Sequence, residues 1–365
     1  MAVDHVRIWT DDPTGRAREM VHRYGFAVAG GCNDGENPGT LSVAVRQGDV
    51  VLLFTRPGPD QVEAIAGLER HGECVGDIAL RVSDVDHAFR RTLDAGGVAL
   101  LRPQPTADGW GGRIAAIAGF GDVRHTLIQV PEKYDEGAYV PGIGPISAFV
   151  GARPRHGVRA IDHFAVCLPS GQLACTVDYY RRVLGCVATS AARVAVGGRA
   201  TRSQAVRSRS QALTITFVEP EPSHAPGRID GFPRDHDGPG VRHIALACDD
   251  IVAAVSGLVD DGVRFPTTPA ARREPARTRP FPMRHSREAL AELGVLVDHD
   301  HDGPLLRIVA ESTHPRGTFS WEIIERPGTR TFGRDDGTAL RESARPTRGT
   351  GPPAWRERPP NRRRA

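Results

Sequence analysis

Residues 162–188 read DHFAVCLPSGQLACTVDYYRRVLGCVA, and residues 4–30 read DHVRIWTDDPTGRAREMVHRYGFAVAG. Each stretch begins with Asp-His, continues as a short strand and a turn, and then shows the spacing of an amphipathic helix that stops at a glycine. Two copies of one pattern, far apart in the same chain, indicate a duplicated unit.

The neighbouring segments repeat in the same order. Residues 72–100 and 238–265 each read as a strand, a helix that starts near an aspartate, a glycine stop and a second strand, and residues 125–132 and 321–328 each read as a closing strand. Many of these strands alternate apolar and polar residues and are joined by short turns, which favours a curved, mostly antiparallel sheet. The sequence therefore predicts an α+β fold of two halves, each built from paired βαβββ units with helices outside.

The repeat also predicts the domain boundaries. We expect a first domain at 1–145, a Gly- and Pro-rich linker at 146–158, a second domain at 159–345 and a disordered Arg- and Pro-rich tail at 346–365. A chain of 365 residues is long enough for two domains that each have a core.

Charge and composition exclude several classes of partner. The net charge of +3 comes from the C-terminal end, where seven arginines and one glutamate follow from Arg345 onward, so the rest of the chain is slightly acidic. We expect no nucleic-acid partner, because that would need a basic face on the folded part. No apolar run approaches the roughly 20 residues of a membrane span, and the N-terminus does not read as a secretion signal. The six scattered cysteines are typical of free core thiols, so we expect a cytoplasmic protein.

Three strands of the second half each carry one potential metal ligand. His243, in GPGVRHIALACDD (238–250), shares its strand face with small residues, and His163 has a similar place in AIDHFAVCL (160–168). Glu322 lies inside the apolar strand TFSWEIIERPG (318–328), where a lone carboxylate is costly unless it is paired or binds a metal. Two histidines and one carboxylate on one face form the facial triad of non-haem Fe(II) oxygenases. For either imidazole alone, a core histidine bonded to a backbone carbonyl is the simpler alternative.

The equivalent positions of the first half are His5, Asp77 and Thr126, so we expect that half to lack a complete ligand set. Two other histidine-rich stretches, RDHDGPG (234–240) and DHDHDGPLL (298–306), are interpreted as polar turns rather than metal loops. One half for chemistry and one for scaffolding is the simplest hypothesis.

The chain resembles the 4-hydroxyphenylpyruvate dioxygenase family of the vicinal oxygen chelate superfamily, from Asp4 to about Leu340. The stretches that carry the resemblance are RYGFAVAG (23–30), GFGDVRHTLIQ (119–129), AIDHF (160–164), GPGVRHIAL (238–246), STHPRGTF (312–319) and EIIERPGTRTFG (322–333). The resemblance implies two tandem vicinal-oxygen-chelate domains, each a curved mixed sheet that forms an open barrel, with a metal site in the second domain alone.

The family's iron ligands fall on His163, His243 and Glu322, so the resemblance implies Fe(II) as the cofactor. It also implies a small 2-oxo acid, 4-hydroxyphenylpyruvate, and O2 as substrates, and it allows a homodimer. Oxidative decarboxylation is followed by hydroxylation of the benzylic carbon, which gives 4-hydroxymandelate, or of the ring, which gives homogentisate. The first product is associated with peptide-antibiotic biosynthesis.

The strand TITFVEP (214–220) bears on which product is formed. It has Thr216 and Val218 where ring-hydroxylating members of the family usually have Pro and Asn, which favours 4-hydroxymandelate. Ser203 matches a serine of the family's pocket, so the resemblance implies that Ser203 and Thr216 position the phenol or its side chain. Ordinary strand residues without such a role are the alternative.

The chain also departs from the family around the pocket. Arg307 stands where the family has Gln and Val309 where it has Phe, and alternation turns both toward the Glu322 face. In the C-terminal helix that closes the pocket, Gly337 and Arg341 replace apolar or aromatic residues. We expect Arg307 to pair with the substrate carboxylate, and the alternative is that its charge weakens Fe(II) binding. The departures leave open a related 2-oxo acid as the substrate, or a non-catalytic binder of the same fold.

Overall fold

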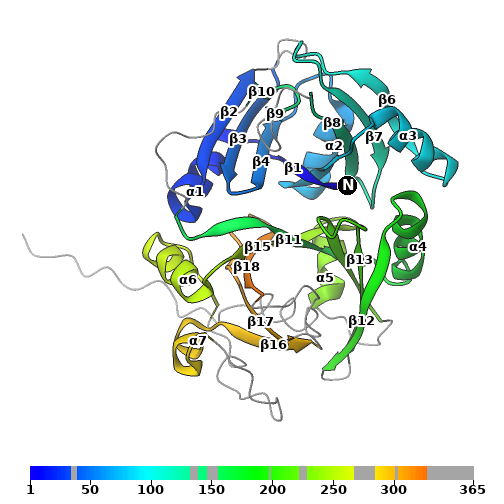
Figure 1. The fold of residues 1–365 in the computed structure, drawn as a ribbon. Helices are drawn as coiled ribbons and strands as arrows, with labels where there is room; N and C mark the ends of the chain where they lie inside the picture. Colours follow the sequence, from blue (N-terminus) through cyan, green and yellow to red (C-terminus); the bar gives the residue numbers. More distant parts are fainter. Residues whose placement is uncertain are drawn as a thin grey trace, which may run out of the picture.

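The computed structural model describes residues 1–33, 39–131, 139–145, 155–196, 199–221, 228–266, 284–300 and 303–326. Two curled eight-stranded sheets, one from each half of the chain, form the framework of the fold, and most helices lie outside them (Figure 1). The predicted α+β fold is therefore confirmed.

The first sheet has the strand order β2-β3-β4-β1-β5-β8-β7-β6. Neighbouring strands are antiparallel except for the pairs β1–β4 and β5–β8, which are parallel. Its strands are β1 (Ala2–Trp9), β2 (Ala27–Asn33), β3 (Leu41–Gln47), β4 (Val50–Arg56), β5 (Cys74–Arg81), β6 (Ala99–Pro105), β7 (Arg113–Ala118) and β8 (Arg124–Gln129). The helices are α1 (Pro13–Tyr24), α2 (Val62–His71) and α3 (Val85–Asp94), and a separate pair of short strands follows, β9 (Tyr139–Val140) and β10 (Gly144–Pro145).

The second sheet repeats this topology in the order β12-β13-β14-β11-β15-β18-β17-β16, with parallel pairs β11–β14 and β15–β18. Its strands are β11 (Val158–Cys167), β12 (Val187–Val196), β13 (Arg199–Arg207), β14 (Thr214–Pro220), β15 (Gly240–Cys248), β16 (Leu296–Asp300), β17 (Gly303–Val309) and β18 (Ser320–Glu325). The helices are α4 (Leu173–Val183), α5 (Arg228–Asp235), α6 (Ile251–Asp260) and α7 (Arg287–Leu293). Every strand of the first sheet has a counterpart at the same place in the second, as the repeat predicts.

Local sequence signals set the ends of several helices. The carboxylates of Asp12, Asp84 and Asp250 each accept a hydrogen bond of 2.8 Å from the backbone amide three residues later, and so cap α1, α3 and α6. α1 ends at Gly25, whose φ of 72° lies in the left-handed region that glycine adopts readily. These caps fix the residue at which each helix begins after its preceding strand.

The two halves share one core, whereas the sequence analysis expects a core in each. A single buried apolar cluster contains residues of both sheets. Tyr180 of α4 connects them, because its ring packs 5.0 Å from that of Phe217 and its hydroxyl lies 2.6 Å from Nε2 of His125 in the first half. Sequence periodicity reports which face of an element is apolar but not which element covers that face, so the shared core was not predictable from it.

The prediction of free core thiols is confirmed for four of the six cysteines. All six are free, but Cys175 is exposed, so the prediction is wrong for it, and Cys32 is half-buried. No helix in the described ranges is long and apolar enough to cross a membrane.

A close backbone contact fixes the start of β11 against the first half. The amide of Asp49 donates a hydrogen bond of 2.6 Å to the carbonyl oxygen of Arg159. Gly48 has a φ of 55°, and a Cβ atom there would lie 2.4 Å from the same oxygen. Only glycine permits this approach, and the contact anchors the strand that carries His163.

A group of stacked rings lies where the halves meet on the other side. His236 is 4% exposed and stacks against His71 of α2 and against Phe232, with ring centroids 4.4 and 4.9 Å apart. The turn predicted within residues 234–240 is present at 236–239, before β15, but His236 in this turn is buried because the first half covers it. Burial, with a smaller contribution from His71, lowers the pKa of His236 to about 3.

The low pKa of His236 predicts a loss of stability in acid. Between pH 6.5 and about pH 3 the unfolded chain binds a proton at this ring and the folded chain does not, so stability falls as the pH falls. At pH 5 the loss is about 2 kcal/mol relative to neutral pH. We expect His236→Phe, which keeps the stacking, to reduce by this amount the drop in unfolding free energy between pH 7.5 and pH 5. Urea denaturation at the two pH values measures it.

His87→Gln is the control for this experiment, because His87 is an exposed histidine. It should leave the pH dependence of the parent unchanged. The same dependence in His236→Phe and the parent would show that His236 does not titrate as described.

Candidate metal centre

Three side chains from adjacent strands meet on the concave face of the second sheet. His163 lies on β11, His243 on β15 and Glu322 on β18. The middle strand, β15, pairs its Ala245 with His163 on one side and with Glu322 on the other. Because alternate residues of a strand share a face, His243 points to the same side as Ala245. The small side chain of Ala245 leaves room for the imidazole and the carboxylate beside it to converge.

The donor atoms of this group are close together. Nε2 of His163 and Nε2 of His243 lie 3.4 and 3.3 Å from the same carboxylate oxygen, Oε2 of Glu322. One donor atom from each residue lies within 4.8 Å of the others. The structure thus brings together the three residues that the sequence analysis singles out.

The group is fully buried, which makes it costly without a cation. The exposed fraction is 0% for His163 and Glu322 and 1% for His243. Among the described residues, neither carboxylate oxygen of Glu322 and neither ring nitrogen of His243 has a hydrogen-bond partner. Buried polar atoms without partners are unfavourable, and two imidazoles with one carboxylate are donors that divalent transition metals accept. The residues present therefore fit a bound metal ion.

The electrostatics of the group favour an anionic carboxylate. Burial acts to raise the pKa of Glu322, but His243 and then His163 and Arg307 lower it by more, so the pKa lies below its usual range. An ionised carboxylate between two imidazoles is the form that binds a metal.

Arg307 is the most unusual neighbour of this centre. Its guanidinium is 1% exposed and lies on β17 with Nη1 3.8 Å from Oε1 of Glu322. Nη2 of Arg307 lies 3.5 Å from Oδ2 of Asp298 on β16, a residue that is itself buried. The inward direction predicted for Arg307 is thus observed. Sequence analysis missed Asp298, because it placed the stretch 298–306 in a polar turn.

The other predicted pocket residues line the same face. Thr216 is paired with Ala165 on the ligand strand β11, and its buried hydroxyl has no hydrogen-bond partner in the described part of the chain. Ser203 pairs with Val218, and Val309 pairs with Glu322. All of these side chains are buried. Gly337 and Arg341, predicted in a pocket-closing helix, lie outside the described residues.

Val218 has apolar neighbours in addition to its place on this face. It packs in a small cluster with Cys167 of β11 and Phe232 of α5. The helix α5 therefore covers the part of the sheet near Val218 with an aromatic ring.

The equivalent place in the first half is filled by an ion pair. Asp77 receives a hydrogen bond of 2.9 Å from Arg124, and the hydroxyl and amide of Thr126 bond to the same carboxylate. Although burial raises the pKa of Asp77, the nearby Arg124 lowers it by more. Within the described residues no group of three potential ligands gathers in this half.

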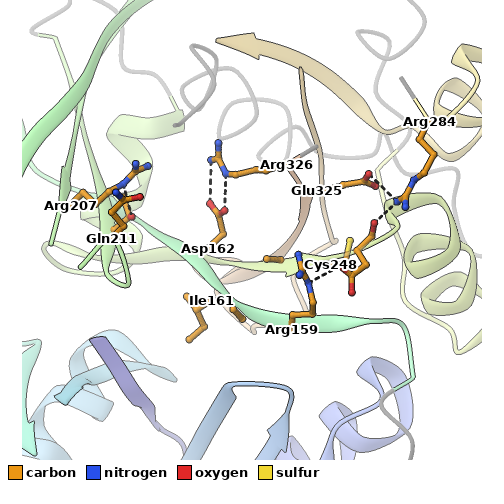
Figure 2. A pocket seen from close by; sticks show the side chains of 13 residues that line it. Arg159, Ile161, Asp162, Arg207, Gln211, Cys248, Arg284, Glu325 and Arg326 are labelled. Atoms are coloured by element: carbon orange, nitrogen blue, oxygen red, sulfur yellow. Dashed lines mark hydrogen bonds and ion pairs between the residues drawn. The ribbon is translucent and has the colours of Figure 1, made fainter. Parts of the chain in front are cut away.

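A second acidic group lies close by but has its own cations. Asp250, His285 and Glu325 also bring donor atoms together. Glu325 accepts hydrogen bonds of 3.0 Å from Arg284 and 2.8 Å from the amide of Ile251 at the start of α6. The guanidinium supplies the countercharge, so we interpret this group as a helix cap. Glu325 and Arg284 of this group line a cavity of about 790 Å³, together with Asp162 and Arg326 (Figure 2).

Comparison with known proteins places these features in a family. Residues 160–278 match the model of the Glyoxalase/Bleomycin resistance protein/Dioxygenase superfamily. The 4-hydroxyphenylpyruvate dioxygenase of Caenorhabditis briggsae is 29% identical over 94% of this chain and 91% of its own length, and that of Dictyostelium discoideum is 26% identical over 93% and 96%.

A solved structure extends the likeness to three dimensions. A triply substituted 4-hydroxymandelate synthase from Streptomyces coelicolor superposes with a TM-score of 0.81 and 34% identity. The match covers 94% of this chain and 97% of the synthase chain. The likeness therefore spans both halves.

Replacing the buried carboxylate tests the metal centre directly. We expect Glu322→Gln to weaken Co(II) binding at least about 100-fold, because a neutral amide is a poor ligand. The metal-free variant should be less stable than the parent at neutral pH, because the imidazoles and Arg307 stabilise the charged form of Glu322 in the fold, and that stabilisation is lost. Co(II) absorption titration and urea denaturation measure the two effects. The surface variant Glu221→Gln is the control, and equal Co(II) affinity in Glu322→Gln and the parent would exclude Glu322 as a ligand.

Proposed function

We propose a specific reaction for this chain on the premise that it belongs to the 4-hydroxyphenylpyruvate dioxygenase family of the vicinal oxygen chelate superfamily. The chain is a non-haem Fe(II) enzyme that converts 4-hydroxyphenylpyruvate and O2 to 4-hydroxymandelate and CO2. The observation that carries the proposal is the convergence of His163, His243 and Glu322 at one buried point.

The ligand residues would hold Fe(II) through two imidazole nitrogens and one carboxylate. These donors come from three adjacent strands of one sheet, so they would bind the ion from the side of the sheet. When bound, Fe(II) supplies the redox chemistry that activates O2 and drives the loss of CO2 from the 2-oxo acid. The burial of the three residues keeps bulk water away from the reacting atoms.

Arg307 is proposed to bind the carboxylate of the 2-oxo acid. Its guanidinium already lies beside Glu322, and a planar guanidinium suits a carboxylate through paired hydrogen bonds. Asp298 holds Nη2 from the other side and balances the charge. A substrate carboxylate that enters this face thus meets a positioned cation.

The remaining pocket residues are proposed to place the aromatic end. Thr216 offers a buried hydroxyl without a partner among the described residues, which suits the phenol or the side chain of the substrate. Ser203, Val218 and Val309 form the adjoining wall. Shifts of about an ångström in ring position decide which carbon is hydroxylated. Thr216 and Val218 on β14 favour the benzylic carbon, on the resemblance described for residues 214–220.

A ring-hydroxylating reaction that gives homogentisate is the second candidate. The names of the relatives from Caenorhabditis and Dictyostelium favour it. A non-catalytic binder of the same fold is less well supported, because such a protein would have no need to bury Glu322 between two imidazoles.

Product analysis distinguishes the candidates. Incubation of the protein with Fe(II), O2 and 4-hydroxyphenylpyruvate should release one CO2 for each molecule of 4-hydroxymandelate, measured by mass spectrometry. His243→Ala is the inactive control. Homogentisate as the main product would replace the proposed reaction with the second candidate, and no product with a protein that binds Fe(II) would favour the binder.

Replacing Arg307 tests its contact with substrate. We expect Arg307→Gln to raise KM for 4-hydroxyphenylpyruvate about 10- to 100-fold, because a hydrogen bond to a charged group is lost. The double variant Arg307→Gln/Asp298→Asn should raise KM equally while its Co(II) affinity stays near that of the parent. Arg307→Gln alone leaves Asp298 as an extra negative charge and should bind Co(II) more tightly. An unchanged KM in both variants would exclude the proposed contact.

A further inference from the structure

An irregularity in β11 places Asp162 beside the ligand His163. The pairing with β15 shifts between Ile161, which faces Leu246, and His163, which faces Ala245, so one extra residue lies between them. In a regular strand, neighbouring side chains point to opposite faces and do not meet. At this β-bulge they do, and Nδ1 of His163 donates a hydrogen bond of 2.8 Å to Oδ1 of Asp162.

Asp162 is in turn held by an arginine from the strand of another ligand. Nε and Nη2 of Arg326 lie 2.7 and 3.2 Å from the two carboxylate oxygens of Asp162 (Figure 2). Arg326 directly follows β18, which carries Glu322. Because β15 lies between β11 and β18, this ion pair spans all three ligand strands. The ion pair therefore links β11, which carries His163, to the end of β18, which carries Glu322.

The hydrogen bond decides which nitrogen of His163 carries the proton. A carboxylate at Nδ1 keeps the proton there, so the lone pair of Nε2 points toward Glu322, 3.4 Å away. Such a partner orients a metal-bound histidine and increases its basicity. His243 differs, because no described residue bonds to its Nδ1. The orientation of the two imidazoles is thus controlled by different means.

The first half contains a similar Asp-His-Arg group, in which the arginine comes from β5, the strand adjacent to β1. Asp4 and His5 are joined at 2.8 Å, Arg81 donates to Asp4 at 2.8 Å, and the register of β1 also shifts between Val3 and Val6. The group therefore has a structural role in both halves, since it is kept in the first half, where the described residues form no group of three potential ligands. Only in the second half does the oriented histidine face a carboxylate and a second imidazole.

We propose that Asp162, fixed by Arg326, is a positioning residue that sets the orientation and basicity of the metal ligand His163. The proposal rests on the proposed function, because it assumes that His163 binds a metal. It assigns to the Asp-His pair of the second half an effect on metal affinity that the equivalent pair of the first half does not have.

The two halves provide a matched pair of variants. We expect Asp162→Asn to weaken Co(II) binding about 10- to 100-fold, with altered Co(II) absorption bands, and to lower the unfolding free energy of the metal-free chain. Asp4→Asn should lower that free energy by a similar amount and leave Co(II) binding unchanged. Arg326→Lys keeps the charge but loses the paired hydrogen bonds, so its Co(II) affinity should lie between those of the parent and Asp162→Asn.

Each outcome decides for or against the proposal. Equal Co(II) affinity in the parent and Asp162→Asn would overturn it and leave the proposed function intact. A parent that binds no Co(II) would overturn both. If Asp162→Asn and Arg326→Lys unfold under conditions in which Asp4→Asn stays folded, the ion pair is a purely structural link and the proposal is wrong.

Discussion

The burial of one carboxylate between two imidazoles is the constraint on which the second half depends. Glu322 has no exposed surface and lies 3.3 to 3.4 Å from Nε2 of His243 and His163. A charge in such a place is tolerated only when nearby groups or a cation compensate it. The strand order meets this need, because β15 lies between β11 and β18 and presents Ala245 where the two outer side chains must converge.

The first half shows a different solution to the same problem. Its topology is the same, and the position equivalent to His243 is a buried carboxylate, Asp77. Arg124 supplies the positive charge there, and Thr126 supplies two hydrogen bonds in place of a third ligand. Because the guanidinium of Arg124 is part of the chain, the charge of Asp77 is compensated without a bound metal ion. The two halves thus share one topology, and a few residues separate an internal ion pair in the first half from a group of potential metal ligands in the second.

The sequence alone predicted the features that follow from repetition and alternation. The α+β class, the repeat and the convergence of His163, His243 and Glu322 depend on which residues share a strand face, and that pattern is local. The bulge at Asp162 was missed, because regular alternation places Asp162 and His163 on opposite faces. Asp298 was missed for another reason, since its stretch was interpreted as a polar turn, whereas it lies on β16, beside the strand of its partner Arg307. Contacts that depend on bulges or on covering elements, such as the burial of His236, are not encoded in periodicity.

The pair formed by Arg307 and Asp298 places a buried cation and its countercharge beside the three potential metal ligands. Two unit charges about 4 Å apart interact by about 4 kcal/mol at the effective dielectric constant of many protein sites. An uncompensated guanidinium 3.8 Å from Glu322 would therefore oppose a bound cation by an amount that affects affinity strongly. Asp298, 3.5 Å from the same guanidinium, cancels most of that effect. Under the proposed function, what remains is a set of directional hydrogen-bond donors that would act on the substrate carboxylate more than on the bound ion.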